Sequence, residues 1–464
     1  MYEALLLASC GLFVVTCAAY VRADQARFVH PATFYLAFHG LAFVVRPLLA
    51  HWYQFEFIYR LYEFEPSMAD KVTAILGANL AMLVFVGVAC AICRKQDGLG
   101  QSDTREAWGA RLFQPIMWTC VVIAPFAVWS QLAHWDQRAE LYGGMVRDAA
   151  TGALINTAQS GWFTDMGLMM APLAVLLVWA ARYRWWGWPF FAVFAVLQAG
   201  TGTRGPLIYA GLALAILYLL EKRRKWPGWQ PLLALTLLGG VFGQILTDRG
   251  DSIRQQFGAS PSSEQTASDQ LKPLEGMDFA NLEYLEFVIH AVPQRTGGYD
   301  YFTSNLQILT EPIPRALWPD KPIGSPVQFF SLWDYGQPIG ITLSVPGAGW
   351  MALGWIGIVL QAALFALLYG TLYRSLVLRG GSAPQLLAYA LLAATAVVVL
   401  RDGMLLSFAR VLPFYLGPLL LVLAFSRLRS GPTAPNKPTG EAQPAPSPAE
   451  RRRALAAGAV PANP

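Results

Sequence analysis

The residues of this chain that could do chemistry are arginines in places where an arginine is costly. Arg204 lies in the glycine-rich segment TGTRGP (Thr201–Pro206), and Arg401 begins RDGM, each between two apolar runs. Arg46 and Arg410 lie inside apolar runs. A guanidinium in such a place needs a carboxylate, a polar cavity or an anionic ligand. Because guanidinium grips phosphate with two hydrogen bonds and keeps its charge, the set favours a site for a lipid diphosphate.

The long polar segment 248–346 adds basic residues and a rigid stretch. It contains EPIPRALWPDKP (Glu311–Pro322), which has four prolines and carries Arg315 and Lys321. Prolines restrict the backbone, so little entropy is lost when such a stretch binds a ligand. We therefore expect it to form a rim that places both basic side chains beside a lipid headgroup. Arg295, earlier in the same segment, adds a further positive charge.

The simpler interpretation of these arginines is local pairing. Arg401 could pair with Asp402, and Arg315 with Asp320. A long basic side chain can also reach the membrane interface and keep its charge in water. We favour an anion site because the set gathers on one side of the expected membrane, against the usual bias of basic residues. The diphosphate-binding candidates are Arg204, Arg295, Arg315, Lys321, Arg401 and Arg410.

A helix is expected within Asp278–Phe302. Its leucine, valine and isoleucine side chains form an apolar stripe, and Glu283, Glu286 and His290 share the opposite face. One interpretation is an amphipathic helix lying on the outer surface. The other is that one of these three residues acts as a general base toward a sugar hydroxyl. Two aromatic residues that could stack on sugar faces follow, Tyr299 and Trp318.

The elements that must position these residues are membrane helices. The chain has 464 residues, of which 55% are hydrophobic and 14% charged, which is typical of a polytopic all-α membrane protein. The net charge of +5 comes from short basic clusters between apolar runs and does not indicate nucleic-acid binding. About eleven apolar runs are long enough to be candidate spans. They lie near residues 2–21, 32–52, 70–93, 114–134, 162–181, 186–201, 206–221, 230–247, 347–373, 384–400 and 403–426.

Most basic clusters fall on one side of this arrangement, so that side is expected to be cytoplasmic. The N-terminus is then outside, the C-terminus inside, and the large loop periplasmic. No disulfide is expected, because all five cysteines lie in apolar runs. The expected organisation is helices 1–8 in 1–247, the periplasmic loop in 248–346, helices 9–11 in 347–428, and a disordered cytoplasmic tail in 429–464.

Several of these segments together resemble the Wzy-type O-antigen polymerases, which join oligosaccharide repeat units. The resembling segments are TGTRG, the loop ending in IPRALWPDKP, LSVPGAGWMALGWIGIVL and the late RDG turn. They run from about Thr201 to Arg410, and the proline–tryptophan stretch is the most specific of them. The first two hundred residues match only as generic spans.

The resemblance implies a GT-C-like fold and a site at the periplasmic face of the bacterial inner membrane. It implies transfer of a growing glycan from undecaprenyl diphosphate to a new lipid-linked repeat unit. That lipid-linked oligosaccharide would be both donor and acceptor, membrane lipid would surround the enzyme, and a chain-length regulator could be a partner. It implies no metal and no cofactor, because the lipid diphosphate is already an activated leaving group. The arginines would hold that diphosphate.

Two other functions fit part of the pattern. An O-antigen ligase uses the same donor but transfers the glycan to lipid A core. The ligases carry a His-Asn pair in their large loop, whereas here Ala291 follows His290. A flippase or other transporter of lipid-linked oligosaccharide is the second alternative. Transporters tend to show inverted repeats, and no repeat is evident in this sequence.

Overall fold

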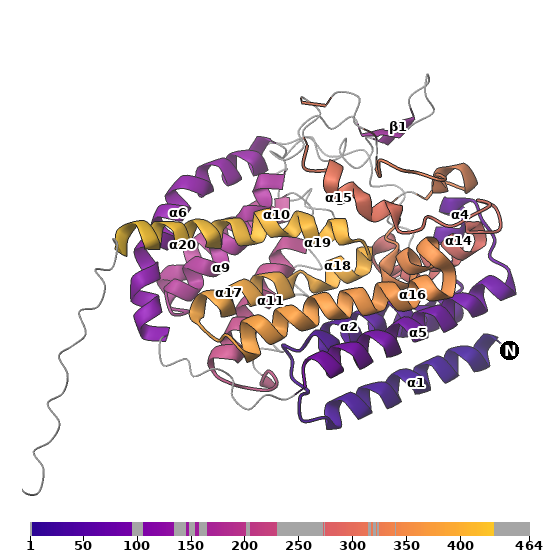
Figure 1. Cartoon of the computed structure of the whole chain (residues 1–464), viewed down its shortest axis with the longest axis horizontal. Helices are drawn as coiled ribbons and strands as arrows, with labels where there is room; N and C mark the ends of the chain where they lie inside the picture. Colours follow the sequence, from indigo (N-terminus) through magenta and orange to yellow (C-terminus); the bar gives the residue numbers. More distant parts are fainter. Residues whose placement is uncertain are drawn as a thin grey trace, which may run out of the picture.

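The computed structural model describes residues 2–94, 105–133, 145–147, 154–156, 165–200, 205–229, 272, 274–313, 317–318, 322, 324–338 and 340–430. This part of the chain is a bundle of apolar helices, with a small antiparallel pair of strands that joins Val146 to Ile155. Figure 1 shows most long helices running roughly along one direction. The strands are β1 (Met145–Arg147) and β2 (Leu154–Asn156).

The N-terminal helices form one side of the bundle and pack tightly. Tyr35 stacks on Phe85 with ring centroids 4.2 Å apart. Ser67 and Asp70 form a capping box that begins α5 at Met68, two residues before the expected start of this span. The wider π-helix η1 ends immediately before Arg46, and such turns are frequent at functional sites. The elements are α1 (Tyr2–Arg22), α2 (Pro31–His39), η1 (Gly40–Val45), α3 (Arg46–Tyr53), α4 (Phe57–Tyr62) and α5 (Met68–Ile92).

The remaining helices complete the bundle. Each expected span outside 230–247 overlaps one helix or several consecutive ones, as 384–400 overlaps Ala383–Ala394 and Ala396–Asp402, and 230–247 lies outside the described residues. These helices are α6 (Arg105–Ala133), α9 (Met170–Ala180), α10 (Trp188–Gly200), α11 (Gly205–Glu221), α16 (Ser344–Tyr373), α17 (Ala383–Ala394), α18 (Ala396–Asp402), α19 (Leu405–Val411) and α20 (Gly417–Ser430).

Six helices of the described part are long and apolar enough to cross a membrane, and a seventh span results if the bent pair α17 and α18 counts as one. The chain is therefore a multi-pass helical membrane protein. Met166–Ala180 and Gly205–Glu221 are apolar but shorter. The expected disordered tail lies outside the described residues from 431 onward, and α20 continues through Ser430, slightly past the expected end of the bundle. All five cysteines are free, as expected.

Helix α16 is broken near its start. Leu353 and Gly354 have non-helical backbone angles, and Gly354 has a φ of 58°. The pieces on either side fold against each other so closely that a Cβ on Gly357 would lie 2.0 Å from the carbonyl oxygen of Gly349. Backbone N–H groups of Asp300 and Tyr301 donate to the carbonyls of Met351 and Ala352, at 2.9 and 3.0 Å. The loop thereby satisfies polar groups that the break exposes.

One end of the bundle gathers basic residues. The His30 and Tyr373 rings lie 5.4 Å apart, and the Phe28 amide donates to the Lys225 carbonyl at 2.8 Å. The ends of α1, α11 and α16 and the start of α2 therefore meet there. The Cys93 thiol contacts the Gly370 carbonyl at 3.7 Å at the same end. The basic residues on the adjoining chain segments are Arg22, Arg27, Arg94, Lys222, Arg223, Arg224, Lys225, Arg374 and Arg379.

Candidate functional site

The helix expected in the large loop forms as α14 (Asn281–Ala291), at the end of the bundle where α1 begins (Figure 1). Of the two interpretations of this helix, the one that places it on the outer surface is wrong. Every residue of α14 is buried except His290, which is half-buried, because α4, α5 and α16 pack around the helix. Its acidic face therefore meets protein rather than water, and each acid needs a partner.

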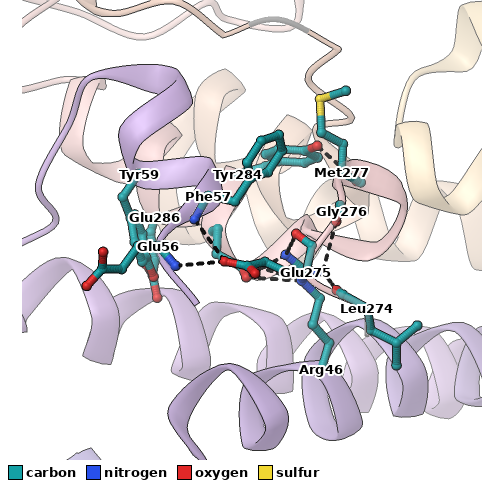
Figure 2. Close-up of polar contacts among 11 residues, drawn as sticks. Arg46, Glu56, Phe57, Tyr59, Leu274, Glu275, Gly276, Met277, Tyr284 and Glu286 are labelled. Carbon is teal, nitrogen blue, oxygen red and sulfur yellow. Dashed lines mark hydrogen bonds and ion pairs between the residues drawn. The ribbon is translucent and has the colours of Figure 1, made fainter. Parts of the chain in front are cut away.

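Arg46 is the partner of Glu283. The Arg46 Nε atom donates to Glu283 Oε1 at 3.0 Å and to Oε2 at 3.3 Å, and Nη2 lies 2.9 Å from Oε1. Arg46 is only 1% exposed. Its other N–H groups donate to the carbonyls of Leu274, Glu275 and Gly276 (Figure 2). This arginine, expected to need a carboxylate or an anion, is thus fully occupied by the chain itself.

Glu275 holds the backbone of the neighbouring loop. Its carboxylate accepts hydrogen bonds from the amides of Glu56 and Phe57, both at 3.3 Å (Figure 2). It also accepts one from the Lys272 amide at 3.1 Å. Burial alone would raise the pKa of Glu275, but these backbone donors outweigh it and hold the pKa below its ordinary value. Glu275 is therefore an ionised structural anchor for α4.

Glu286 is a buried carboxyl group of a different kind. It is 1% exposed and accepts a hydrogen bond from the Tyr59 hydroxyl at 2.8 Å, while its Oε1 atom has no partner among the described residues. Burial, reinforced by the Glu283 carboxylate, raises the pKa of Glu286 to about 8. Glu286 is consequently protonated at neutral pH, and no sugar hydroxyl can reach it in this arrangement.

His290 faces Asp70 across the start of α5. Their Nδ1 and Oδ2 atoms lie 3.3 Å apart, and both side chains are partly accessible. When imidazole Nδ1–H donates to a carboxylate, Nε2 is left as an acceptor that can take a proton. Of the three expected base candidates, His290 alone is reachable from solvent and has an orienting carboxylate.

The RDG turn forms a second polar cluster, between α18 and α19. Arg401 Nε lies 3.6 Å from Asp402 Oδ1, which is the local pairing that the sequence suggested. The same Nε atom is buried and has no hydrogen-bond partner in the described part of the chain. The Ser407 hydroxyl donates to Asp402 at 3.0 Å, and Arg410 Nη2 lies 2.7 Å from Asp165 Oδ2. The Arg401 and Arg410 side chains are 30% and 52% exposed, so both can still meet a ligand.

Other chain segments approach this cluster. Tyr209, near the start of α11, is close enough to interact electrostatically with Arg401 and Asp402. Its hydroxyl would lie 2.9 Å from a Cβ on Gly205, the first residue of α11. Glu311 interacts electrostatically with Arg410. The segments that contain Gly205 and Glu311 are those that carry Arg204 and Arg315 in the sequence.

The structure does not bring every expected residue together. Arg295 is exposed and follows the far end of α14, whereas the start of that helix touches the Arg401 carbonyl. Tyr299 packs at the break of α16, where its hydroxyl would lie 2.8 Å from a Cβ on Gly354. Trp318 is 37% exposed. Three expected residues lie outside the described part of the chain: Arg204, Arg315 and Lys321.

Sequence reasoning missed the partners of these side chains. Asp70 was not singled out in the sequence, and nothing near it pointed to His290. Tyr59 and Asp165 lie far along the chain from Glu286 and Arg410. Arg46 was recognised as needing a partner, but its carboxylate comes from a residue 237 positions away.

Comparison with protein-family models, with curated proteins and with solved structures found no match to this chain.

Proposed function

We propose that this chain polymerises undecaprenyl-diphosphate-linked oligosaccharide repeat units into O-antigen or a related surface polysaccharide. The observation that carries the proposal is the RDG cluster, where Arg401 and Arg410 remain partly exposed and the Arg401 Nε atom lacks a hydrogen-bond partner within the described ranges. A diphosphate offers the anionic oxygens that such guanidinium groups bind best. The proposal includes an eleven-span, GT-C-like arrangement.

The distribution of charge supports a site at the periplasmic face of the bacterial inner membrane. The end of the bundle formed by residues near Phe28, Cys93 and Tyr373 carries the basic clusters, which the positive-inside rule assigns to the cytoplasm. The RDG cluster and α14 lie at the opposite ends of α16 and α5. A lipid diphosphate that reaches them would come from the periplasmic leaflet.

The proposed step is a displacement at the anomeric carbon of the donor sugar. A hydroxyl of the acceptor forms the new bond, the bond to the diphosphate oxygen breaks with its electron pair, and the hydroxyl proton leaves. Arg401 and Arg410 would offset the charge that grows on the diphosphate, as preorganised charge does in many enzymes. Inversion at the anomeric carbon follows from a single displacement.

We assign the proton acceptor to His290, oriented by Asp70. Glu283 is neutralised by Arg46, and Glu286 is buried and protonated, so neither offers an accessible base. Asn281, which contacts the Arg401 carbonyl, lies nine residues before His290, or about 14 Å along the helix. The anomeric carbon is bonded directly to the diphosphate oxygen, so the extended Arg401 side chain and the diphosphate would together have to cover most of this length.

The test is reconstitution of the full chain in lipid vesicles with the undecaprenyl-diphosphate-linked repeat unit of the native strain. Wild-type protein should produce a ladder of glycans and release undecaprenyl diphosphate. Arg401→Ala should reduce the rate about a hundredfold or more, as loss of a transition-state donor does. Arg60→Ala is the matched control, because Arg60 is an exposed arginine whose partner is the neighbouring Glu56.

The other outcomes identify the alternatives. Transfer of a single glycan only when lipid A core is supplied would establish a ligase. Movement of the lipid-linked oligosaccharide between leaflets without any glycan product would establish a transporter. A wild-type ladder that Arg401→Ala leaves intact would retain the polymerase and refute the role of the RDG cluster.

A further inference from the structure

Two buried amide side chains hold the backbone of the RDG turn. Asn281, at the start of α14, donates from Nδ2 to the Arg401 carbonyl at 3.3 Å and to the Thr342 carbonyl at 3.0 Å. Gln361, in α16, donates from Nε2 to the Gly403 carbonyl at 2.7 Å. The two residues are 0% and 1% exposed. The carbonyls on both sides of Asp402 are thus held by helices distant in the sequence.

The turn also packs closely against the start of α16. Gly403 has a φ of 71°, which favours glycine. A Cβ on this residue would lie 2.0 Å from the carbonyl oxygen of Ser344. The backbone of the turn therefore has a single position, set by α14, by α16 and by the absence of a side chain at Gly403.

Both amides leave their oxygen atoms unsatisfied. Oδ1 of Asn281 and Oε1 of Gln361 are buried without a hydrogen-bond partner among the residues that the structure describes. Their orientation is determined, because each NH2 group must face the carbonyl that it donates to. An unpaired buried acceptor offsets most of the stability that one hydrogen bond gives. Apolar side chains of the same size would remove the unpaired oxygens but would leave the Arg401 and Gly403 carbonyls without these donors. The amides therefore act through the backbone of the turn.

That geometry decides where the Arg401 guanidinium lies. Its contact with Asp402 is loose, at 3.6 Å, and its buried Nε atom has no hydrogen bond to the described part of the chain. The side chain therefore depends on its own backbone for position. We propose that Asn281 and Gln361 are positioning residues, which hold the RDG backbone so that Arg401 is preset for an anionic oxygen of the diphosphate. This inference rests on the proposed function for its catalytic consequence.

Substitutions of matched size test the proposal. Gln361→Met and Asn281→Leu remove the amides while filling the space. Tyr369→Phe is the control, because Tyr369 is buried in the same helix as Gln361 and its hydroxyl has no hydrogen-bond partner among the described residues. Each variant of the full chain, in vesicles, is compared for thermal midpoint, for kcat and KM with the lipid-linked repeat unit, and for amide hydrogen exchange in peptides covering 396–411.

We expect both amide variants to fold with lowered thermal midpoints, because turn carbonyls lose their donors. Both should also lose about tenfold in kcat/KM, the scale of one charge-assisted hydrogen bond. Exchange in 396–411 should rise in both and stay unchanged in Tyr369→Phe. In an Arg401→Lys background, Gln361→Met should lower kcat/KM by a much smaller factor than it does in the wild type, because the effects of residues that act through one another are not additive.

Three results would overturn the proposal. Wild-type kcat/KM in both amide variants would show that the turn needs no such support. Equal losses from Gln361→Met in the wild-type and Arg401→Lys backgrounds would show that Gln361 acts elsewhere. Unchanged exchange in 396–411 would refute the clamp itself, and this measurement stands even if the wild-type protein makes no polymer. In that case the polymerase assignment fails separately.

Discussion

Replacing Arg46 by methionine should severely destabilise the protein. The change leaves the Glu283 carboxylate buried without its counter-charge, with a side chain only 6% exposed. Breaking a buried ion pair by removing one partner costs about 3–5 kcal/mol. The three carbonyls of Leu274, Glu275 and Gly276 also lose a charged donor, at up to about 1–3 kcal/mol for each acceptor left unsatisfied. Because water can reach part of this loop, we expect a total of about 5 kcal/mol.

The double variant Arg46→Met with Glu283→Leu separates charge from packing. Replacing both members of a buried ion pair by apolar residues is often neutral or stabilising. The double variant should therefore be more stable than Arg46→Met alone, although the three carbonyls still lack their donor. Together with the wild type and the Glu283→Leu single variant, these proteins form a double-mutant cycle that measures the coupling between Arg46 and Glu283.

The assay is thermal unfolding of the purified full chain in one detergent, with all four proteins compared at the same heating rate, because unfolding of such a protein is often irreversible. Arg60→Met is the control, since its ion pair with Glu56 is exposed and contributes little. A wild-type midpoint for Arg46→Met would refute the reasoning. A double variant as unstable as the single one would show that the carbonyl contacts, and not the charge pair, hold α14.

Two further predictions concern the other acidic and basic groups of α14. Burial raises the pKa of Glu286 from 4.5 to about 8, so between these pH values the folded state holds a proton that the unfolded state releases. The contribution of protonated Glu286 to stability is therefore complete below pH 4.5 and is lost as pH rises to about 8. Glu286→Gln should flatten this part of the pH–stability curve and be more stable than wild type above pH 8; an unchanged slope in thermal midpoints from pH 5 to 9 would contradict it. His290→Ala should lower kcat about a hundredfold without changing the thermal midpoint, the scale of general-base catalysis, and Asp70→Asn should lower it less because the imidazole remains. Wild-type kcat in a single-turnover assay of His290→Ala would remove His290 from the mechanism.

Local patterns in the sequence predicted where helices lie in the described part of the chain, although only six or seven of the eleven expected spans are long and apolar enough there to cross a membrane. A run of apolar residues long enough to cross a membrane has few alternatives to a helix, since every backbone polar group must be satisfied within the segment. For α5, the Ser67 and Asp70 box also marks the start of the helix. The pair of Arg401 and Asp402 was also predictable from the sequence, because residues that are neighbours in the chain are near in space.

The site depended on contacts that no local pattern contains. The sequence showed that Arg46 needed a partner, but hydrophobic periodicity carries no information about which distant carboxylate supplies it. The acidic face of α14 looked like a water-facing surface, since its spacing is that of an amphipathic helix, and the packing of α4 and α5 over it reversed that interpretation.

What the sequence alone determined is therefore the class of the protein, the helices, and the arginines that require explanation. Only the tertiary structure decided which arginine is neutralised within the fold and which remains open. Arg46 is enclosed by Glu283 and three carbonyls. Arg401 has only the loose ion pair with Asp402, and its buried Nε atom makes no hydrogen bond to the described residues, beside a turn held by Asn281 and Gln361. The physical reason is that burial raises the cost of an unpaired polar group at both positions, while the partners that offset it come from helices brought together only by folding.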